Sequence, residues 1–137
     1  MSVNQVVIPN SMETFYLNTD LDLIGYSSLK SLVQELENSC SVLHCDQISE
    51  QKWTATLETN QIITENPNDQ IREFCQNIET LSNQAKEIWW SLEKREFNAG
   101  YNAGNTWGYT STLTFETIQL LHKYNCSFTI TIYPEDK

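Results

Sequence analysis

Asp20 and Asp22 are the first residues whose type and spacing could support chemistry, because one residue separates the two carboxylates. Carboxylates in a loop after a strand can bind Mg²⁺, and they can also attract a basic partner. In a chain with a formal net charge of −10, closely spaced acids are also expected without a function. We therefore predict no metal here and keep Asp20 and Asp22 as candidate partner-binding residues.

Cysteine and histidine do not form a recognisable metal motif. His44 and Cys45 are adjacent, and adjacent residues of a strand point to opposite faces, so the two are poorly placed to bind one ion. No cysteine pair has the CxxC spacing of zinc sites. We expect no cofactor and four reduced structural thiols, at Cys40, Cys45, Cys75 and Cys126.

Nucleophilic catalysis requires a base beside the nucleophile. The histidines are His44 and His122, and His122 adjoins the apolar stripe of a predicted helix. No GxSxG motif is present. The sequence therefore predicts no catalytic residue and favours a protein that is not an enzyme.

Residues 100–108 form a glycine- and aromatic-rich stretch. Phosphate loops use glycine together with a lysine and a nearby helix N-terminus, but no lysine follows here. Glycine and asparagine also accept positive φ where a strand bends or turns. Recognition is a further interpretation, because tyrosine and tryptophan anchor many interfaces. The candidate binding residues in this stretch are Tyr101, Asn102, Trp107 and Tyr109.

Composition restricts the partners. The chain has 8 basic and 18 acidic residues, and no basic cluster exceeds two residues. Nucleic acid and anionic membranes are therefore poor partners, whereas a basic protein is compatible. No apolar run has the length of a membrane span, and the N-terminal residues do not resemble a signal peptide. We expect a cytoplasmic protein.

Alternating apolar residues predict strands over residues 13–19, 42–46, 52–59, 96–103 and 126–133. In the first strand Phe15 and Leu17 are expected to share one face, and residues 20–25 are expected to form a turn. Residues 1–11 lack periodicity and are expected to form a flexible arm. The inward residues of the last strand are expected to be Cys126, Phe128, Ile130 and Ile132.

Helices are predicted where apolar residues recur three and four positions apart, over residues 29–36, 71–78, 85–92 and 115–121. Asn66 with Pro67 and Thr114 are typical helix starts. Ser82 and Asn83 interrupt the middle segment, which predicts two consecutive helices or one kinked helix. Residues 88–92 also fit a short strand, and this alternative stays open. The residues expected to bury the last helix are Phe115, Ile118, Leu120 and Leu121.

The predicted element order is β-α-β-β-α-α-β-α-β. This mixture indicates an α+β fold, with a mixed, mostly antiparallel sheet and helices packed on one face. The polar alternate positions of the strands agree, because an antiparallel sheet can expose one face to water. The length fits a single domain over residues 1–137, with 39% apolar residues to form its core.

Several motifs resemble those of small uncharacterised bacterial proteins, cyanobacterial ones among them. EFNAGYNAG and LTFETIQLLHKYNCSFTITIYP are similar to their C-terminal half, and FYLNTDLDL, SVLHC and KWTATLE extend the resemblance over most of the chain. The resemblance implies a fold but no catalytic residues. The matching residues are Phe97, Gly100, Tyr101, Thr114, Glu116, Thr117, Tyr133 and Pro134.

Size, acidity and fold class are also similar to those of immunity proteins from bacterial toxin systems, which is an analogy only. The leading hypothesis is a non-enzymatic protein that binds another macromolecule, and immunity to a basic toxin is one form of it. One alternative is a small-ligand-binding protein or enzyme with a pocket near residues 100–108. The other is an oligomerising structural domain.

Overall fold

The computed structural model describes residues 13–60, 65–105 and 107–134, so the predicted arm at residues 1–11 lies outside the described residues. None of its helices is long and apolar enough to cross a membrane. The elements are β1 (Phe15–Gly25), α1 (Lys30–Leu36), β2 (Cys40–Ser49), β3 (Lys52–Thr59), α2 (Pro67–Glu79), α3 (Asn83–Ser91), β4 (Lys94–Asn102), α4 (Phe115–Lys123) and β5 (Ser127–Tyr133).

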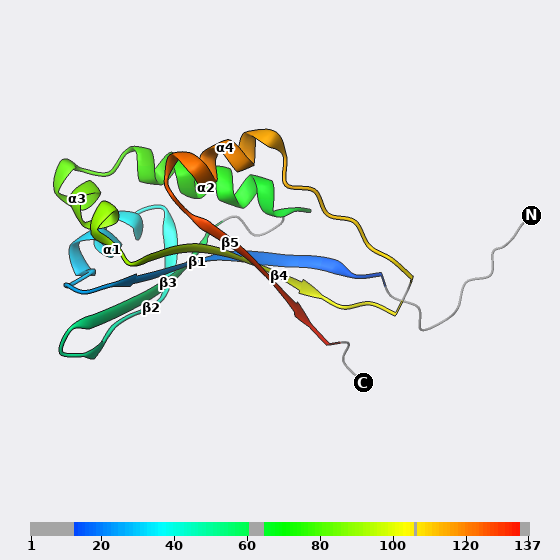
Figure 1. The fold of residues 1–137 in the computed structure, drawn as a ribbon, viewed down its shortest axis with the longest axis horizontal. Coiled ribbons are helices and arrows are strands. Elements are labelled where there is room, and N and C mark those ends of the chain that lie inside the picture. The colour runs from blue at the N-terminus through cyan, green and yellow to red at the C-terminus, as the bar shows by residue number, and fades with distance from the viewer. Residues whose placement is uncertain (1–12, 61–64, 106, 135–137) are drawn as a thin grey trace, which may run out of the picture.

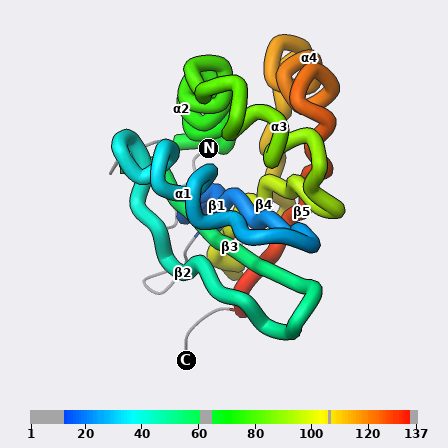
Figure 2. The backbone as a smooth tube through the Cα atoms, turned by 90° about the vertical axis from the view of Figure 1, so that its left-hand side faces the viewer, coloured from blue at the N-terminus to red at the C-terminus, as the bar shows by residue number. Residues whose placement is uncertain are grey.

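The strands form one mixed sheet in the order β2-β3-β1-β4-β5. The neighbours from β2 to β4 are antiparallel, and β5 runs parallel to β4 after the crossover through α4. The helices all lie on one face of this sheet (Figure 1), and the end view in Figure 2 shows α2 and α4 side by side above it. The predicted α+β fold, element order and one-sided helix layer are confirmed.

The starts of α2 and α4 follow the predicted capping chemistry, whereas Leu29 at the start of α1 makes no side-chain capping hydrogen bond. The side chains of Asn66, Ser82 and Thr114 each accept a hydrogen bond from a backbone N–H of the first helical turn, which satisfies a donor that has no partner within the helix. Ser82 separates α2 from α3, and residues 88–91 are helical. The alternative strand at residues 88–92 is therefore wrong, since the buried Trp89 lies on the core side of α3.

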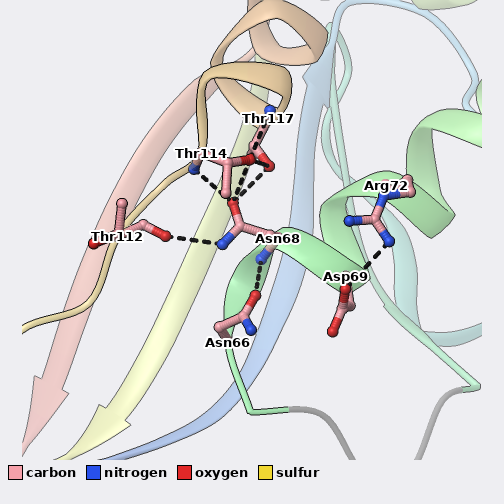
Figure 3. Close-up of polar contacts among 7 residues, drawn as sticks. All are labelled: Asn66, Asn68, Asp69, Arg72, Thr112, Thr114 and Thr117. Atoms are coloured by element: carbon pink, nitrogen blue, oxygen red, sulfur yellow. Dashed lines mark hydrogen bonds and ion pairs between the residues drawn. The ribbon is translucent and has the colours of Figure 1, made fainter.

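Asn68, in the first turn of α2, joins the N-termini of α2 and α4 (Figure 3). Its Oδ1 accepts hydrogen bonds from the Thr114 backbone N–H at 2.9 Å and from the Thr117 hydroxyl at 2.6 Å. Its Nδ2 donates to the carbonyl oxygen of Thr112 at 2.8 Å. Because Asn68 is buried, one amide fixes α4 and the segment before it against α2.

β1 is longer than predicted, and the turn expected at residues 20–25 is wrong. Leu21 and Leu23 are buried under the helices, while Asp20 and Asp22 alternate with them on the other face. As the central strand, β1 gains hydrogen bonds from both β3 and β4, and this pairing outweighs the low strand propensity of aspartate.

A register shift between Tyr16 and Asn18 reverses the predicted faces at the start of β1. Tyr16 is buried, whereas Phe15 and Leu17 are exposed. An extra residue in one strand changes which side chains point inward, and alternation alone does not reveal it.

The predicted burial of α4 and β5 is also partly wrong. Leu121 is buried and Leu120 partly so, but Phe115 and Ile118 are 69% and 51% exposed. On β5, Phe128 packs against the core, whereas Ile130 and Ile132 are 54% and 62% exposed. β5 is an edge strand, so its apolar residues lie at the border of the helix layer.

Candidate functional site

The sheet face turned away from the helices, here called the open sheet face, is polar. Alternate residues of the strands point to it, except at the register shifts of β1 and β2. Its polar residues include His44, Asp46, Thr54, Thr56, Glu58, Asp20, Asp22, Lys94, Glu96, Asn98, Thr129 and Thr131.

A chain of hydrogen bonds crosses three strands of this face. Thr56 on β3 donates to Asp22 Oδ1 on β1 at 2.8 Å, and its hydroxyl oxygen lies 2.9 Å from His44 Nε2 on β2. Because the Thr56 proton is given to Asp22, His44 Nε2 is the donor of the second bond. His44 Nδ1 lies 3.5 Å from Asp46 Oδ2. Asp22 and His44 are therefore held in fixed positions.

Asp20 lies at the centre of the open sheet face, between Asp22 and the carboxylate of Glu58. Asn18 Nδ2 donates to Asp20 Oδ1 at 2.9 Å and to Glu58 Oε2 at 3.4 Å. Burial, and then the charges of Asp22 and Glu58, raise the pKa of Asp20 to about 6, although the Asn18 hydrogen bond opposes this. No ion pair of the described residues joins a cation to Asp20, Asp22 or Glu58.

The cations of this face lie away from Asp20. Lys94 is opposite Ile24 near the end of β1, where its Nζ lies 3.2 Å from Glu96 Oε1. Lys52 lies at the start of β3, opposite Ser49. Glu96 also accepts a hydrogen bond from Thr129 at 2.8 Å. The negative charge of the open sheet face is therefore concentrated around Asp20, Asp22 and Glu58.

A polar cleft adjoins this acidic centre, where β1 and β3 separate. The two strands pair from Asp20 to Gly25, so the residues of β1 before Asp20 have no partner in β3. Gln70 of α2 fills part of the gap. Thr59 Oγ1 is buried here without a hydrogen-bond partner among the described residues. The cleft has a volume of about 380 Å³ and is lined by Leu17, Asn18, Ser41, Glu58, Thr59, Asn60 and Gln70.

Tyr101 and Tyr109 pack together on the helix side of the sheet, and the candidate aromatic residues do not form one surface. Tyr101 is buried, with its hydroxyl 2.7 Å from Ser111 Oγ and its ring 5.5 Å from that of Tyr16. Tyr109 packs its ring on Tyr101, 5.8 Å away, and is half exposed. Trp107 is 99% exposed. Tyr101 is thus a core residue, and Trp107 is available for contact.

Asn102 is the last residue of β4, paired with Phe15 of β1 and Tyr133 of β5. The structure therefore brings Asp20 and Asp22 together but separates them from the other candidates. Asn18, Glu58 and Glu96 also lie on the open sheet face, but they were not among the candidate residues predicted from the sequence. The alternation of polar residues from Asn18 through Asp20 and Asp22 is the signal that could have placed Asn18 beside Asp20.

The described part of the chain contains no group of three or more His, Cys, Asp or Glu residues arranged to hold a metal ion. All four cysteines are free. His44 lies opposite Thr56 and Cys45 opposite Ala55, so their side chains point to different faces as predicted. Burial raises the pKa of Cys40 to about 11 and that of Cys75 to about 12, which makes both thiols poor nucleophiles.

No family model, curated protein or solved structure matches this chain.

Proposed function

We propose that this protein acts by binding a basic protein partner through the acidic centre of its open sheet face. The observation that carries the proposal is the position of Asp20, Asp22 and Glu58, which face outward on adjacent strands. Burial, and then the charges of Asp22 and Glu58, raise the pKa of Asp20, so a cation placed beside it would favour its ionised form. A lysine or arginine from a partner would supply the missing positive charge.

Several features suit this face to binding. Hydrogen bonds from Asn18 and Thr56 hold the carboxylates of Asp20 and Asp22 in place, so little side-chain entropy would be lost on association. The net charge of −10 would steer a basic partner toward the protein. Immunity to a basic toxin is one concrete form of this function.

A matched pair of double variants tests the proposal. Asp20→Asn with Asp22→Asn removes two charges from the open sheet face while keeping side-chain shape. Glu87→Gln with Glu116→Gln removes two charges from exposed positions on the helices. Each variant has the same net charge, so a difference between them reports on location and not on total charge.

The probe is an oligolysine peptide, titrated into ¹⁵N-labelled protein at low salt. We expect chemical-shift changes around Asp20 and Asp22, about tenfold weaker binding in the Asp20→Asn/Asp22→Asn variant, and little change in the helix variant. High salt should abolish the shifts. Equal weakening in both variants, or shifts spread evenly over all acidic residues, would contradict a specific acidic site.

A second candidate function is supported by a groove beside residues 100–108. It has a volume of about 220 Å³ and is lined by Thr14, Tyr101, Tyr109, Ser111, Ile130 and Ile132. Its mixture of aromatic rings and hydroxyls suits a small, flat, largely apolar ligand. A thermal-shift screen of such compounds tests this function, and Tyr109→Ala should remove any reproducible increase in the melting temperature.

A further inference from the structure

The outer edge of β5 lacks the features that usually protect an edge strand. Among the described residues β5 pairs with β4 alone, so the other side of Ser127–Tyr133 is free. The strand reads SFTITIY and contains no charge and no proline. Its pairing with β4 is continuous, without a bulge. Edge strands with these properties are prone to pair with another strand.

The opposite edge of the same sheet is different. β2 pairs with β3 through two register shifts, one between Val42 and His44 and one between Gln47 and Ser49. It also carries His44 and Asp46 on the strand itself. Bulges and charges both hinder pairing with a further strand. Of the two edges, only β5 is therefore suited to extend the sheet.

The hydrogen bonds between β4 and β5 show which backbone N–H and C=O groups of β5 point away from β4. The carbonyl oxygen of Tyr133 accepts a hydrogen bond from the Ala103 N–H at 2.8 Å, so Tyr133 points its backbone groups toward β4. Because these directions alternate along a strand, Phe128, Ile130 and Ile132 present their N–H and C=O groups to the outer edge. Their side chains lie on the helix side, opposite Phe97, Ala99 and Tyr101.

We propose that β5 pairs antiparallel with β5 of a second copy of this chain, about a two-fold axis at Ile130. In this register the two Ile130 residues face each other, and Phe128 of each copy faces Ile132 of the other. All of these residues present free backbone donors and acceptors, so the hydrogen-bonded pairs of an antiparallel ladder form throughout. Their apolar side chains meet on one face and become buried.

A second copy fits better than other occupants because this edge is self-complementary. Ile130 is the midpoint of Ser127–Tyr133, so the symmetric register uses the whole strand. No charge of β5 opposes another, despite the net charge of each chain. A two-fold dimer through β5 is a closed assembly, so no β5 edge remains free in it.

Analytical ultracentrifugation tests this dimer with Ile130→Lys and a matched control, Ile48→Lys. Ile130 and Ile48 are 54% and 56% exposed and lie on opposite edge strands. We expect the unmodified protein to sediment at twice the chain mass of 15.9 kDa. Ile130→Lys should raise the dimer Kd at least about tenfold, because two lysines then meet at the axis, and Ile48→Lys should leave it unchanged. Circular dichroism checks that both variants are folded.

Cross-linking tests the register. Antiparallel hydrogen-bonded partners have Cα atoms about 5.5 Å apart, which a disulfide can span. Ile130→Cys should therefore give a covalent dimer under mild oxidation, whereas Ile48→Cys and the unmodified protein should not. A monomer at every concentration would overturn the proposal. So would a dimer that survives Ile130→Lys, which would indicate another interface.

The dimer and the proposed partner site can be tested independently. Salt should strengthen β5 pairing, because it screens the repulsion between two acidic chains, but should weaken binding of a basic partner. The Asp20→Asn/Asp22→Asn variant should retain the dimer. Failure of either proposal therefore leaves the other unaffected.

Discussion

Gln70 Oε1 accepts a hydrogen bond of 2.6 Å from the backbone N–H of Thr19, so a helix side chain takes the place of a missing strand partner. The bond lies where β1 separates from β3. The same oxygen accepts a second hydrogen bond of 2.8 Å from the hydroxyl of Tyr16. Gln70 is buried, so α2 both closes one side of the polar cleft and satisfies two donors of β1.

Gln70→Ala should lower the free energy of unfolding by about 2–3 kcal/mol, because two buried donors lose their acceptor. Gln76→Ala, an exposed position in the same helix, is the control and should change it by less than about 0.5 kcal/mol. Urea denaturation measures both. If the two substitutions had equal effects, the hydrogen bonds of Gln70 would not be important for stability.

Asp20 should make the stability of the protein depend on pH. Its pKa rises from 3.8 to about 6 on folding, so between these values the folded state binds more protons than the unfolded state. The free energy of unfolding therefore falls as pH rises through this range, and it stays lower above the folded pKa. Ionised Asp20 thus opposes folding at neutral pH, mainly because it is partly buried beside Asp22 and Glu58.

Asp20→Asn removes this penalty. It should raise the free energy of unfolding at neutral pH by about 1 kcal/mol, a value reduced to allow for solvent screening, with a smaller effect below the unfolded pKa. Glu87→Gln, an exposed acid on α3, controls for the loss of one charge. Denaturation curves across the acidic range measure the effect. A variant less stable than the parent at neutral pH would contradict the assigned environment of Asp20.

Truncation to alanine should hardly change the stability of the protein at Trp107 but should lower it strongly at Tyr101. Trp107 is 99% exposed, so Trp107→Ala should change the free energy of unfolding by less than about 0.5 kcal/mol. Tyr101 is 3% exposed and packs on Tyr16, so Tyr101→Ala should cost about 3–5 kcal/mol. Thermal unfolding of both variants measures the contrast. Unfolding caused by Trp107→Ala would show that the indole belongs to the core.

The parts of the fold that could be predicted from the sequence depend on local patterns. Lys52–Thr59 alternates without interruption, and β3 has the predicted bounds. Helix caps are also local, so the predicted starts at Asn66 and Thr114 are confirmed. The open, polar sheet face follows from the same alternation.

Features that depend on distant pairing could not be predicted. The position of β1 between β3 and β4 keeps Asp20 and Asp22 in a strand, and nothing within residues 20–25 reveals those neighbours. The exposure of Ile130 likewise depends on the edge position of β5, since alternation marks an apolar face whether or not a helix covers it. The polar cleft was missed because α2 supplies Gln70 from a distant part of the chain.

Asn68 should be the most sensitive polar residue between α2 and α4. Thr114 and Thr117 donate to its Oδ1, and its Nδ2 donates to Thr112 (Figure 3). Asn68→Ala should lower the free energy of unfolding by about 2–4 kcal/mol, because several partly buried groups lose their partner together. The affected groups begin α4, so amide hydrogen exchange should accelerate there more than in β1.

Asn68→Asp separates the two roles of this side chain. Aspartate keeps the acceptor for Thr114 and Thr117 but cannot donate to the carbonyl of Thr112, so its effect should be smaller than that of alanine. Asn83→Ala, at the exposed start of α3, is the control and should have little effect. Uniform acceleration of exchange in all helices would indicate global destabilisation. Selective acceleration in α4 would show that Asn68 fixes the start of α4.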